Sequence, residues 1–266
     1  MFRAFAALCL IASLAACGSG PAPRQSGPAP AVSAHVQPPN FSDAKPIANW
    51  GGKPPSSYAV HGIDVARFQT AIDWREAARN GVNFAFIKAT EGGDMVDPMF
   101  ADHWAGAARA GVPRGAYHFF YHCRPAAEQA RWFIKHVPRV AGALPPVLDM
   151  EWTPFSPTCT LRRDGATLRQ EARIFLDIIS RHYGKRPILY TSIDFFQDNE
   201  MWKVTEADFW LRAVAKHPRD LYAGHHWRFW QYTSTGLVPG IREQVDINVF
   251  DGSAAQWRAW LGANSR

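Results

Sequence analysis

Short apolar segments alternate with segments of helical periodicity along most of this chain. The apolar segments lie near 59–66, 83–89, 113–120, 146–151 and 187–192. The helical patterns that follow them lie near 71–80, 98–110, 125–137, 164–183 and, in a shorter stretch, 194–201. This alternation predicts parallel strands joined by right-handed crossover helices.

The pattern changes after Lys203. Three strand-like segments remain, at 209–213, 227–232 and 245–250, and loops with little helical periodicity join them. About eight strands are therefore expected in all, with helices only in the first units. We predict an α/β fold, a modified TIM-like barrel of five β/α units followed by three strands with few helices. Reactive groups should lie at the C-terminal ends of the strands.

The N-terminus has the features of an export signal. Met1-Phe2-Arg3 precedes an apolar run, residues 4–16, that is too short for a comfortable membrane span and is typical of a signal peptide. Its end, Leu14-Ala15-Ala16-Cys17-Gly18, resembles the lipobox of bacterial lipoproteins. That resemblance implies that Cys17 becomes the first mature residue and carries acyl chains that anchor it in a membrane. An ordinary signal peptide with a chance cysteine is the alternative.

The residue after Cys17 suggests a destination. Gly18, in place of an acidic residue, resembles the outer-membrane sorting class of Gram-negative lipoproteins, which here implies an outer-membrane anchor facing the periplasm. The following residues, to about Ser57, are rich in Pro, Ala, Ser and Gly, lack apolar periodicity and indicate a tether. The expected organisation is a signal peptide at 1–16, a lipidated tether at 17–57 and a barrel domain at 58–266.

Composition fits one large exported domain. The 266 residues are 47% hydrophobic, which suffices for an α/β barrel core. The formal charge of +6 suits an anionic partner without identifying one. No Lys or Arg run, Gly-rich phosphate loop or Cys-x-x-Cys pair indicates nucleic acid or nucleotide binding. His118 and His122 are four residues apart, but no third ligand is evident, so we predict no metal and no cofactor.

The cysteines agree with export. Cys9 belongs to the signal and Cys17 to the lipid anchor, which leaves Cys123 and Cys159 as a pair. Both follow predicted strands that would be neighbours in a barrel, so a disulfide is geometrically plausible. Two free buried thiols are the alternative.

The most informative residues are two acids at the end of the strand near 146–151. Asp149 and Glu151 are two positions apart, so on a strand their side chains share a face. Each carboxylate raises the proton affinity of the other, and cleavage of a glycosidic bond needs one protonated and one ionised carboxyl. Two solvated acids at a strand end are the alternative.

Two further strands also carry an acid where a buried strand should be apolar. Asp64 lies in 61–65 and Asp246 lies in 244–250. Burying an unpaired carboxylate costs several kcal/mol, so three such strands indicate a purpose other than core packing. We expect the acids to converge at one site. Structural caps or hydrogen-bond anchors for the strands are the alternative.

Residues 59–260 resemble glycoside hydrolase family 25, the muramidases of bacteria, fungi and phages. The motifs that carry the resemblance are His61-Gly62-Ile63-Asp64-Val65, Phe86-Ile87-Lys88-Ala89-Thr90-Glu91-Gly92, Gly115-Ala116-Tyr117-His118-Phe119, Leu148-Asp149-Met150-Glu151, Trp230-Gln231-Tyr232 and Val245-Asp246-Ile247-Asn248. The family implies a modified barrel that cuts the β-1,4 bond after N-acetylmuramic acid in peptidoglycan. Ala66 departs from the family, which often has Ser there.

The resemblance and the chemistry assign roles to the acids. Glu151 is the expected general acid, protonating the leaving oxygen and later activating water. Asp149 is the expected ionised partner, acting either as nucleophile or as an orienting base for the 2-acetamido group, and both routes retain configuration. Asp64 and Asp246 are expected to orient the sugar and tune the pair.

Substrate contacts are expected from neighbouring motifs. Tyr117 and Trp230 are candidates for stacking on sugars or bonding the acetamido group, with core packing as the alternative, and Gln231 is placed with them as substrate-binding. Lys88 and Glu91 are either substrate contacts or an ion pair at the rim.

The leading function is therefore a monomeric peptidoglycan hydrolase whose partners are glycan strands and, through Cys17, a membrane. A non-catalytic or differently specific wall-binding lipoprotein on the same barrel is the alternative, because fold alone does not fix function. The clustered acids favour the enzyme. A chitinase-like barrel would show a longer Asp-x-x-Asp-x-Asp-x-Glu run, which is missing.

Overall fold

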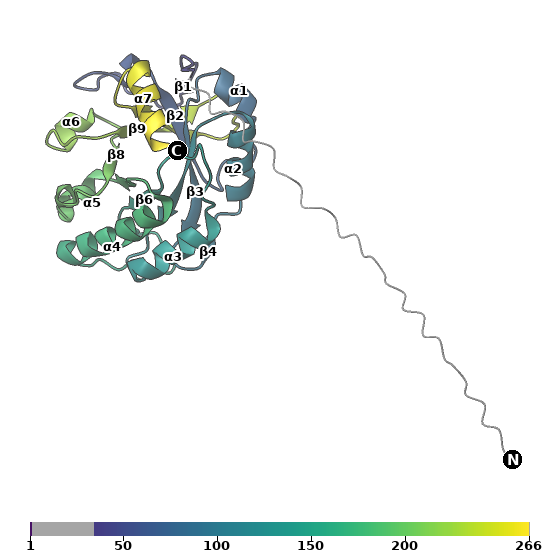
Figure 1. Cartoon of the computed structure of the whole chain (residues 1–266). Coiled ribbons are helices and arrows are strands. Elements are labelled where there is room, and N and C mark those ends of the chain that lie inside the picture. The colour runs from purple at the N-terminus through teal and green to yellow at the C-terminus, as the bar shows by residue number, and fades with distance from the viewer. Residues whose placement is uncertain (2–34, 266) are drawn as a thin grey trace.

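The computed structural model describes Met1 and residues 35–265. Residues 35–265 contain a closed barrel with helices around it (Figure 1). The predicted signal peptide, Cys17 and the first part of the predicted tether lie outside the described residues. Within the described part of the chain, no helix is long and apolar enough to cross a membrane.

Five β/α units come first, as predicted. They are β2 (His61–Val65) with α1 (Trp74–Arg79), β3 (Ala85–Glu91) with α2 (Phe100–Arg109), β5 (Arg114–Phe119) with α3 (Ala126–His136), β6 (Val147–Met150) with α4 (Gly165–Tyr183), and β7 (Ile188–Thr191) with α5 (Ile193–Asp198). Strands β8 (Asp208–Arg212), β9 (Phe229–Leu237) and β10 (Val245–Phe250) follow. The smaller elements are β1 (Ser42–Asp43), β4 (Met95–Val96), α6 (Pro218–Leu221), α7 (Ala254–Asn264) and the 3-10 turns Pro55–Ser57 and Met201–Lys203.

Eight strands close the barrel in the order β2-β3-β5-β6-β7-β8-β9-β10. Pairing is parallel from β2 to β9, whereas β10 runs antiparallel between β9 and β2 and completes the ring. The predicted fold class, an α/β barrel with few helices in its second half, is confirmed. Of these eight barrel strands, all except β10 therefore have their C-terminal ends at the same mouth of the barrel.

Local sequence explains the long helix α4. The side chain of Asp164 accepts the backbone N–H of Thr167 at 2.9 Å and so caps the N-terminus. Gly184 ends the helix in the left-handed conformation, with φ +66°. Between them, buried apolar side chains recur at a spacing of three to four residues, at Leu168, Ala172, Phe175, Leu176, Ile179 and Tyr183. This stripe packs against the outside of the barrel.

The other end of the barrel is closed by aromatic side chains. Phe84, Phe229 and Phe250 fill its interior, and Trp257 of α7 lies against Phe84 and Phe250 with ring centroids 5.4 and 5.2 Å away. Sequence reasoning missed this C-terminal helix, although Ser253 and Gln256 form a capping box at its start. Because one end is closed, the interior is open only at the C-terminal ends of the parallel strands.

Part of the segment expected to be tether packs on the barrel instead. β1 pairs with β9 through Ser42 and Asp43, and the N–H of Gln37 donates to Asn83 Oδ1 at 2.7 Å. Trp50 lies edge-on to Trp230, with ring centroids 5.4 Å apart. The folded unit therefore extends upstream of residue 58, the boundary expected from composition. The composition of this segment could not predict these contacts, because each is made with a residue distant in the chain.

Candidate active site

A pocket of about 630 Å³ occupies the open mouth of the barrel. Inward-facing residues alternate along each strand, so the upper layer of the interior comes from one face of every strand. The acids Asp64, Asp149, Glu151 and Asp246 all line this pocket. As predicted, acids from three separate strands meet in one pocket.

Asp149 and Glu151 have unusual environments. Asp149 is buried, and within the described residues its Oδ1 has no hydrogen-bond partner. Burial, and next the charge of Glu151, raise the pKa of Asp149 well above its ordinary value. Burial raises the pKa of Glu151 to about 7, although the positive charge of Arg212 opposes the shift. The backbone carbonyl of Glu151 accepts a hydrogen bond from His122 Nε2 at 2.8 Å, which fixes the chain just beyond β6.

Asp64 and Asp246 form a second carboxyl pair. They face each other across the antiparallel strands β2 and β10, and their side chains share a hydrogen bond. Burial raises the pKa of Asp64 to about 6, while the amides of Asn248 and Gln231 lower it by donating to Oδ2 at 2.7 and 3.0 Å. Burial and then the charge of Asp64 raise the pKa of Asp246 well above its usual range. Asp246 is therefore the protonated member.

Gln231 connects this pair to the tyrosines of the pocket. Its amide nitrogen donates to Asp64, and its carbonyl oxygen accepts the hydroxyl of Tyr190 at 2.9 Å. Tyr117 lines the same pocket, and burial raises the pKa of Tyr117 well above its usual value. Burial also raises the pKa of Tyr190, so both hydroxyls are neutral: that of Tyr117 can donate to or accept from a ligand, and that of Tyr190, which donates to Gln231, can accept.

Lys88 and Glu91 form an ion pair that lines the pocket. Lys88 Nζ lies 2.5 Å from Glu91 Oε2, and the ammonium also lies 4.5 Å from the ring centre of Phe119. The hydroxyl of Tyr121 donates to the other oxygen of Glu91. Lys88 and Glu91 therefore form the ion pair that was expected as one of two possibilities. Because the pair lines the pocket, a ligand bound there would also contact it.

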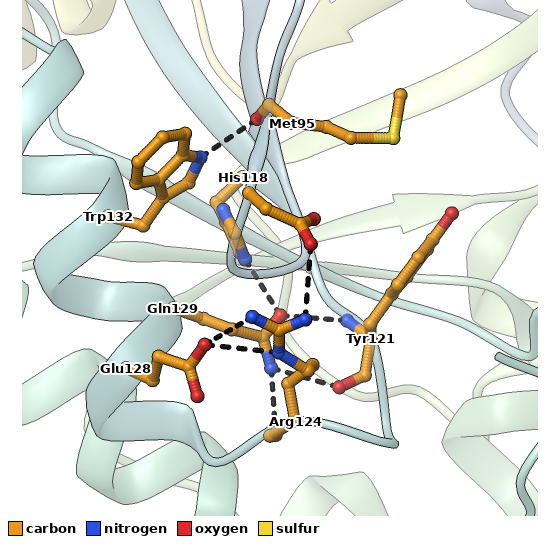
Figure 2. A network of polar contacts seen from close by, with 8 residues as sticks. Met95, His118, Tyr121, Arg124, Glu128, Gln129 and Trp132 are labelled. Atoms are coloured by element: carbon orange, nitrogen blue, oxygen red, sulfur yellow. Dashed lines mark hydrogen bonds and ion pairs between the residues drawn. The ribbon is translucent and has the colours of Figure 1, made fainter. Parts of the chain in front are cut away.

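Tyr121 is held from behind by the fully buried Gln129 of α3 (Figure 2). Gln129 Oε1 accepts the backbone N–H of Tyr121 at 2.9 Å and His118 Nε2 at 3.0 Å, and its Nε2 donates to the Tyr121 carbonyl at 2.9 Å. The other ring nitrogen of His118 meets the hydroxyl of Thr90 at 2.7 Å. His118 therefore has a structural role, and no group of three metal-ligating side chains exists among residues 35–265.

The structure does not bring Trp230 to the pocket. Trp230 is adjacent to Gln231 on β9 and so points outward, fully buried between the barrel wall and Trp50, with its indole N–H on the Ala213 carbonyl at 2.8 Å. Of the two roles expected for Trp230, stacking on a sugar and core packing, the structure contains core packing. His61 is likewise on an outward face, where it contacts the hydroxyl of Tyr232 at 3.2 Å.

Sequence reasoning missed several residues of the pocket, among them Arg212, Tyr190 and Trp210. Arg212 and Tyr190 line the pocket, and Trp210 lines it while its indole N–H donates to Asn248 Oδ1 at 2.7 Å. Arg212 stands two positions after Trp210, so the two side chains share one face of β8, which the closed barrel turns inward. The structure also contains the disulfide Cys123–Cys159, with Cα atoms 5.7 Å apart.

A model of glycosyl hydrolases family 25 matches residues 63–241 of the chain. This chain belongs to family 25. Uncharacterized protein YegX of Escherichia coli (strain K12) is 36% identical over 227 residues, covering 84% of this chain and 80% of YegX. Lysozyme M1 of Streptomyces globisporus is 33% identical over 217 residues, covering 76% of this chain and 71% of that protein.

Solved structures agree. A family 25 glycosyl hydrolase from Bacillus anthracis is 34% identical and superposes with a TM-score of 0.72, over 78% of this chain and 95% of that one. The bacterial lysozyme from Streptomyces coelicolor is 30% identical with a TM-score of 0.68, over 77% and 97%. This chain is therefore a glycoside hydrolase. Its membership of family 25 supports peptidoglycan as the substrate class.

The site of this family 25 hydrolase suits acid–base chemistry on a glycoside. Glu151, with a pKa of about 7, can hold a proton near neutral pH and can also release it. The pocket adds a second carboxyl at Asp149, neutral hydroxyls and three cations, Arg67, Lys88 and Arg212. Such a set can donate a proton, support positive charge and hold a sugar.

Proposed function

We propose that this protein hydrolyses the β-1,4 bond between N-acetylmuramic acid and N-acetylglucosamine in peptidoglycan, with retention of configuration. The observation that carries the proposal is the Asp149–Glu151 pair, two carboxyls with raised pKa values at the pocket of a family 25 barrel. A retaining glycosidase needs one protonated and one ionised carboxyl, and two interacting carboxyls supply this because each raises the proton affinity of the other, so that the pair holds a single proton.

Glu151 is the general acid and base in this proposal. It gives its proton to the oxygen leaving from the anomeric carbon of the muramic residue, and the C–O bond breaks. It then takes a proton from the water that attacks the same carbon. A pKa of about 7 supports both halves of this cycle.

Asp149 supports the positive charge that develops at the anomeric carbon. The carboxylate either attacks that carbon, forming a glycosyl ester that water hydrolyses, or orients the 2-acetamido oxygen for the attack. Each route involves two displacements at the carbon and so retains its configuration. The buried Oδ1 of Asp149 has no hydrogen-bond partner among the described residues, and leaving such an atom unpaired is costly. This supports a role for Asp149 in which a bound substrate supplies the missing partner.

The remaining pocket residues bind and orient the sugar. Asp64 and Asp246 act as a protonated pair that can both donate and accept, and Gln231 is bonded to Asp64. Tyr117, Lys88 and Glu91 complete the proposed substrate contacts, since all three line the pocket.

We also propose that the mature protein is a monomer anchored through acylated Cys17, in the outer membrane and facing the periplasm. The Leu-Ala-Ala-Cys stretch and the signal-like run before it support this location, and the peptidoglycan substrate proposed above agrees with export. No cofactor enters the reaction.

The test of the bond assignment is a digest of purified peptidoglycan, with products reduced by borohydride and identified by mass. We expect N-acetylmuramitol at the new ends, because the muramic carbon is the one attacked. N-acetylglucosaminitol would overturn the bond assignment, and anhydromuramic ends would indicate a lytic transglycosylase.

A further inference from the structure

Two phenylalanines at the rim of the pocket are largely exposed to solvent. Phe155, in the loop after β6, exposes 96% of its surface, and Phe68, in the loop after β2, exposes 66%. Both line the pocket that contains the acids. Scattered exposed hydrophobic residues are normal on a protein surface, so exposure alone would mean little. Their position and their supports carry the argument.

The loop that presents Phe155 is braced on both sides. Before it, the hydroxyl of Thr153 donates to the Cys159 carbonyl at 2.7 Å. After it, the hydroxyl oxygen of Ser156 accepts the N–H of Cys159 at 3.0 Å. The disulfide from Cys159 to Cys123 ties the loop to the segment after β5. Phe155 is thus held out into solvent by a short constrained loop.

The turn that presents Phe68 is braced in the same way. The N–H of Gln69 donates to the Ala66 carbonyl at 3.1 Å, and Gln69 Oε1 accepts the N–H of Ala66 at 3.2 Å. The N–H of Arg67 donates to Asp97 Oδ2 at 2.9 Å. These bonds fix the backbone that carries Phe68, so less of the turn has to be ordered when a ligand binds.

The two rings stand at separate parts of one continuous pocket. Strands β2 and β6, which precede the two loops, are separated around the barrel by β3 and β5. The rim between them carries Lys88, Glu91 and Tyr121, whose charged and hydroxyl groups are partners for sugar hydroxyls. Aromatic faces flanking a polar strip suit an occupant with apolar faces and polar edges, which describes a pyranose ring.

We propose that Phe68 and Phe155 are stacking platforms for sugar rings beyond the two that flank the cleaved bond. The inference rests on the proposed hydrolysis of glycan strands and adds a preference for long strands over short ones. The disulfide Cys123–Cys159 serves this binding by holding the Phe155 loop against the mouth.

The experiment measures kcat and KM of the full-chain protein on peptide-free strands of four and eight alternating sugars. For Phe155→Ala and Phe68→Ala we expect kcat/KM on the eight-sugar strand to fall about tenfold, equal to about 1.4 kcal/mol. The loss should lie in KM, and the four-sugar strand should change less than about twofold. Phe155→Tyr keeps an aromatic face and should restore the wild-type value.

Leu161→Ala is the matched control, because Leu161 lies in the same β6–α4 connection and is 49% exposed but does not line the pocket. It should leave both strands unaffected. Cys123→Ala/Cys159→Ala should reproduce the KM effect of Phe155→Ala on the long strand, and unchanged kinetics would remove the disulfide from the proposal. If that variant does not fold, the phenylalanine variants still decide the question.

Three outcomes would overturn the platforms: equal losses on both strands, losses in kcat alone, or no loss. The same strands are also assayed with their stem peptides attached, and a loss seen only there would assign the rings to the peptide and refute the sugar assignment. Failure of the wild type to cut either strand would instead contradict the proposed function, so the two failures are distinguishable.

Discussion

Asp64 and Asp246 lie directly opposite each other on β2 and β10, with a hydrogen bond joining their carboxyl groups. Such a bond requires a proton between two acids. Asp64 already accepts amide hydrogens from Gln231 and Asn248, so the proton belongs on Asp246. The folded protein therefore binds a proton that the unfolded chain releases at neutral pH.

This bound proton predicts a pH-dependent stability. A carboxyl whose folded pKa is raised stabilises the fold most at low pH, and its contribution is lost as pH rises toward the folded pKa. Asp246→Asn keeps a donor toward Asp64 without a titrating proton. We expect the loss of unfolding free energy between pH 5 and pH 8 to be smaller in this variant by roughly 1–3 kcal/mol.

Urea denaturation at the two pH values checks the prediction. Asp102→Asn is the control, since Asp102 is exposed on α2, and it should keep the wild-type pH dependence. A pH dependence in Asp246→Asn equal to that of the wild type would mean that the pair does not hold the proton.

Glu151→Gln should nearly abolish lysis while the fold remains intact. The amide keeps the shape of the side chain but has no proton to give to the leaving oxygen, and general acid catalysis is worth on the order of 10²–10⁴-fold. The rate of release of reducing ends from peptidoglycan measures the effect, and circular dichroism checks the fold. A variant as fast as the wild type would refute the assignment of Glu151.

Removing the charge of Arg212 should shift the pH profile upward. Glu151 must be protonated in the free enzyme, so kcat/KM should fall as pH rises above about 7. The positive charge of Arg212 lowers the pKa of Glu151, and Arg212→Gln should raise that pKa and move the alkaline limb to higher pH by roughly half a unit to one unit.

Arg67→Gln is the matched control for Arg212. Arg67 also lines the pocket, but its charge acts on Glu91 rather than on Glu151. Its removal should leave the alkaline limb in place. Equal shifts in the two variants would argue that the overall charge of the pocket, rather than Arg212, sets the limb.

Cys17→Ser should release the protein from the membrane fraction. The variant cannot be acylated, and membrane binding through acyl chains is lost with them. We expect full activity on isolated wall fragments, because the site lies within the barrel, and sedimentation of membranes with immunodetection measures the partition. Cys9→Ser, in the apolar run, should remain membrane-bound. Unchanged partition of Cys17→Ser would contradict the anchor.

Much of the barrel could be predicted from sequence because its signals are local. Apolar segments alternating with helical periodicity required a parallel sheet, and the change after Lys203 required a helix-poor second half. The spacing of Asp149 and Glu151 placed both on one face of β6, since side chains on a strand alternate with period two. The acids Asp64 and Asp246 were found because a charge in an apolar strand is costly without a site to serve.

The alternation of side chains along a strand leaves open which of its two faces points into the barrel. Only closure of the barrel decides this. Trp230 and Gln231 are neighbours on β9, and sequence could not tell that the glutamine faces the acids while the tryptophan packs outward against Trp50. Arg212 was missed for a related reason, because nothing local marks the inward face of β8. Long-range packing likewise decided that residues 36–50 return to the barrel and that α7 closes its end. Each of these depends on surfaces that exist only after the strands have closed into a ring.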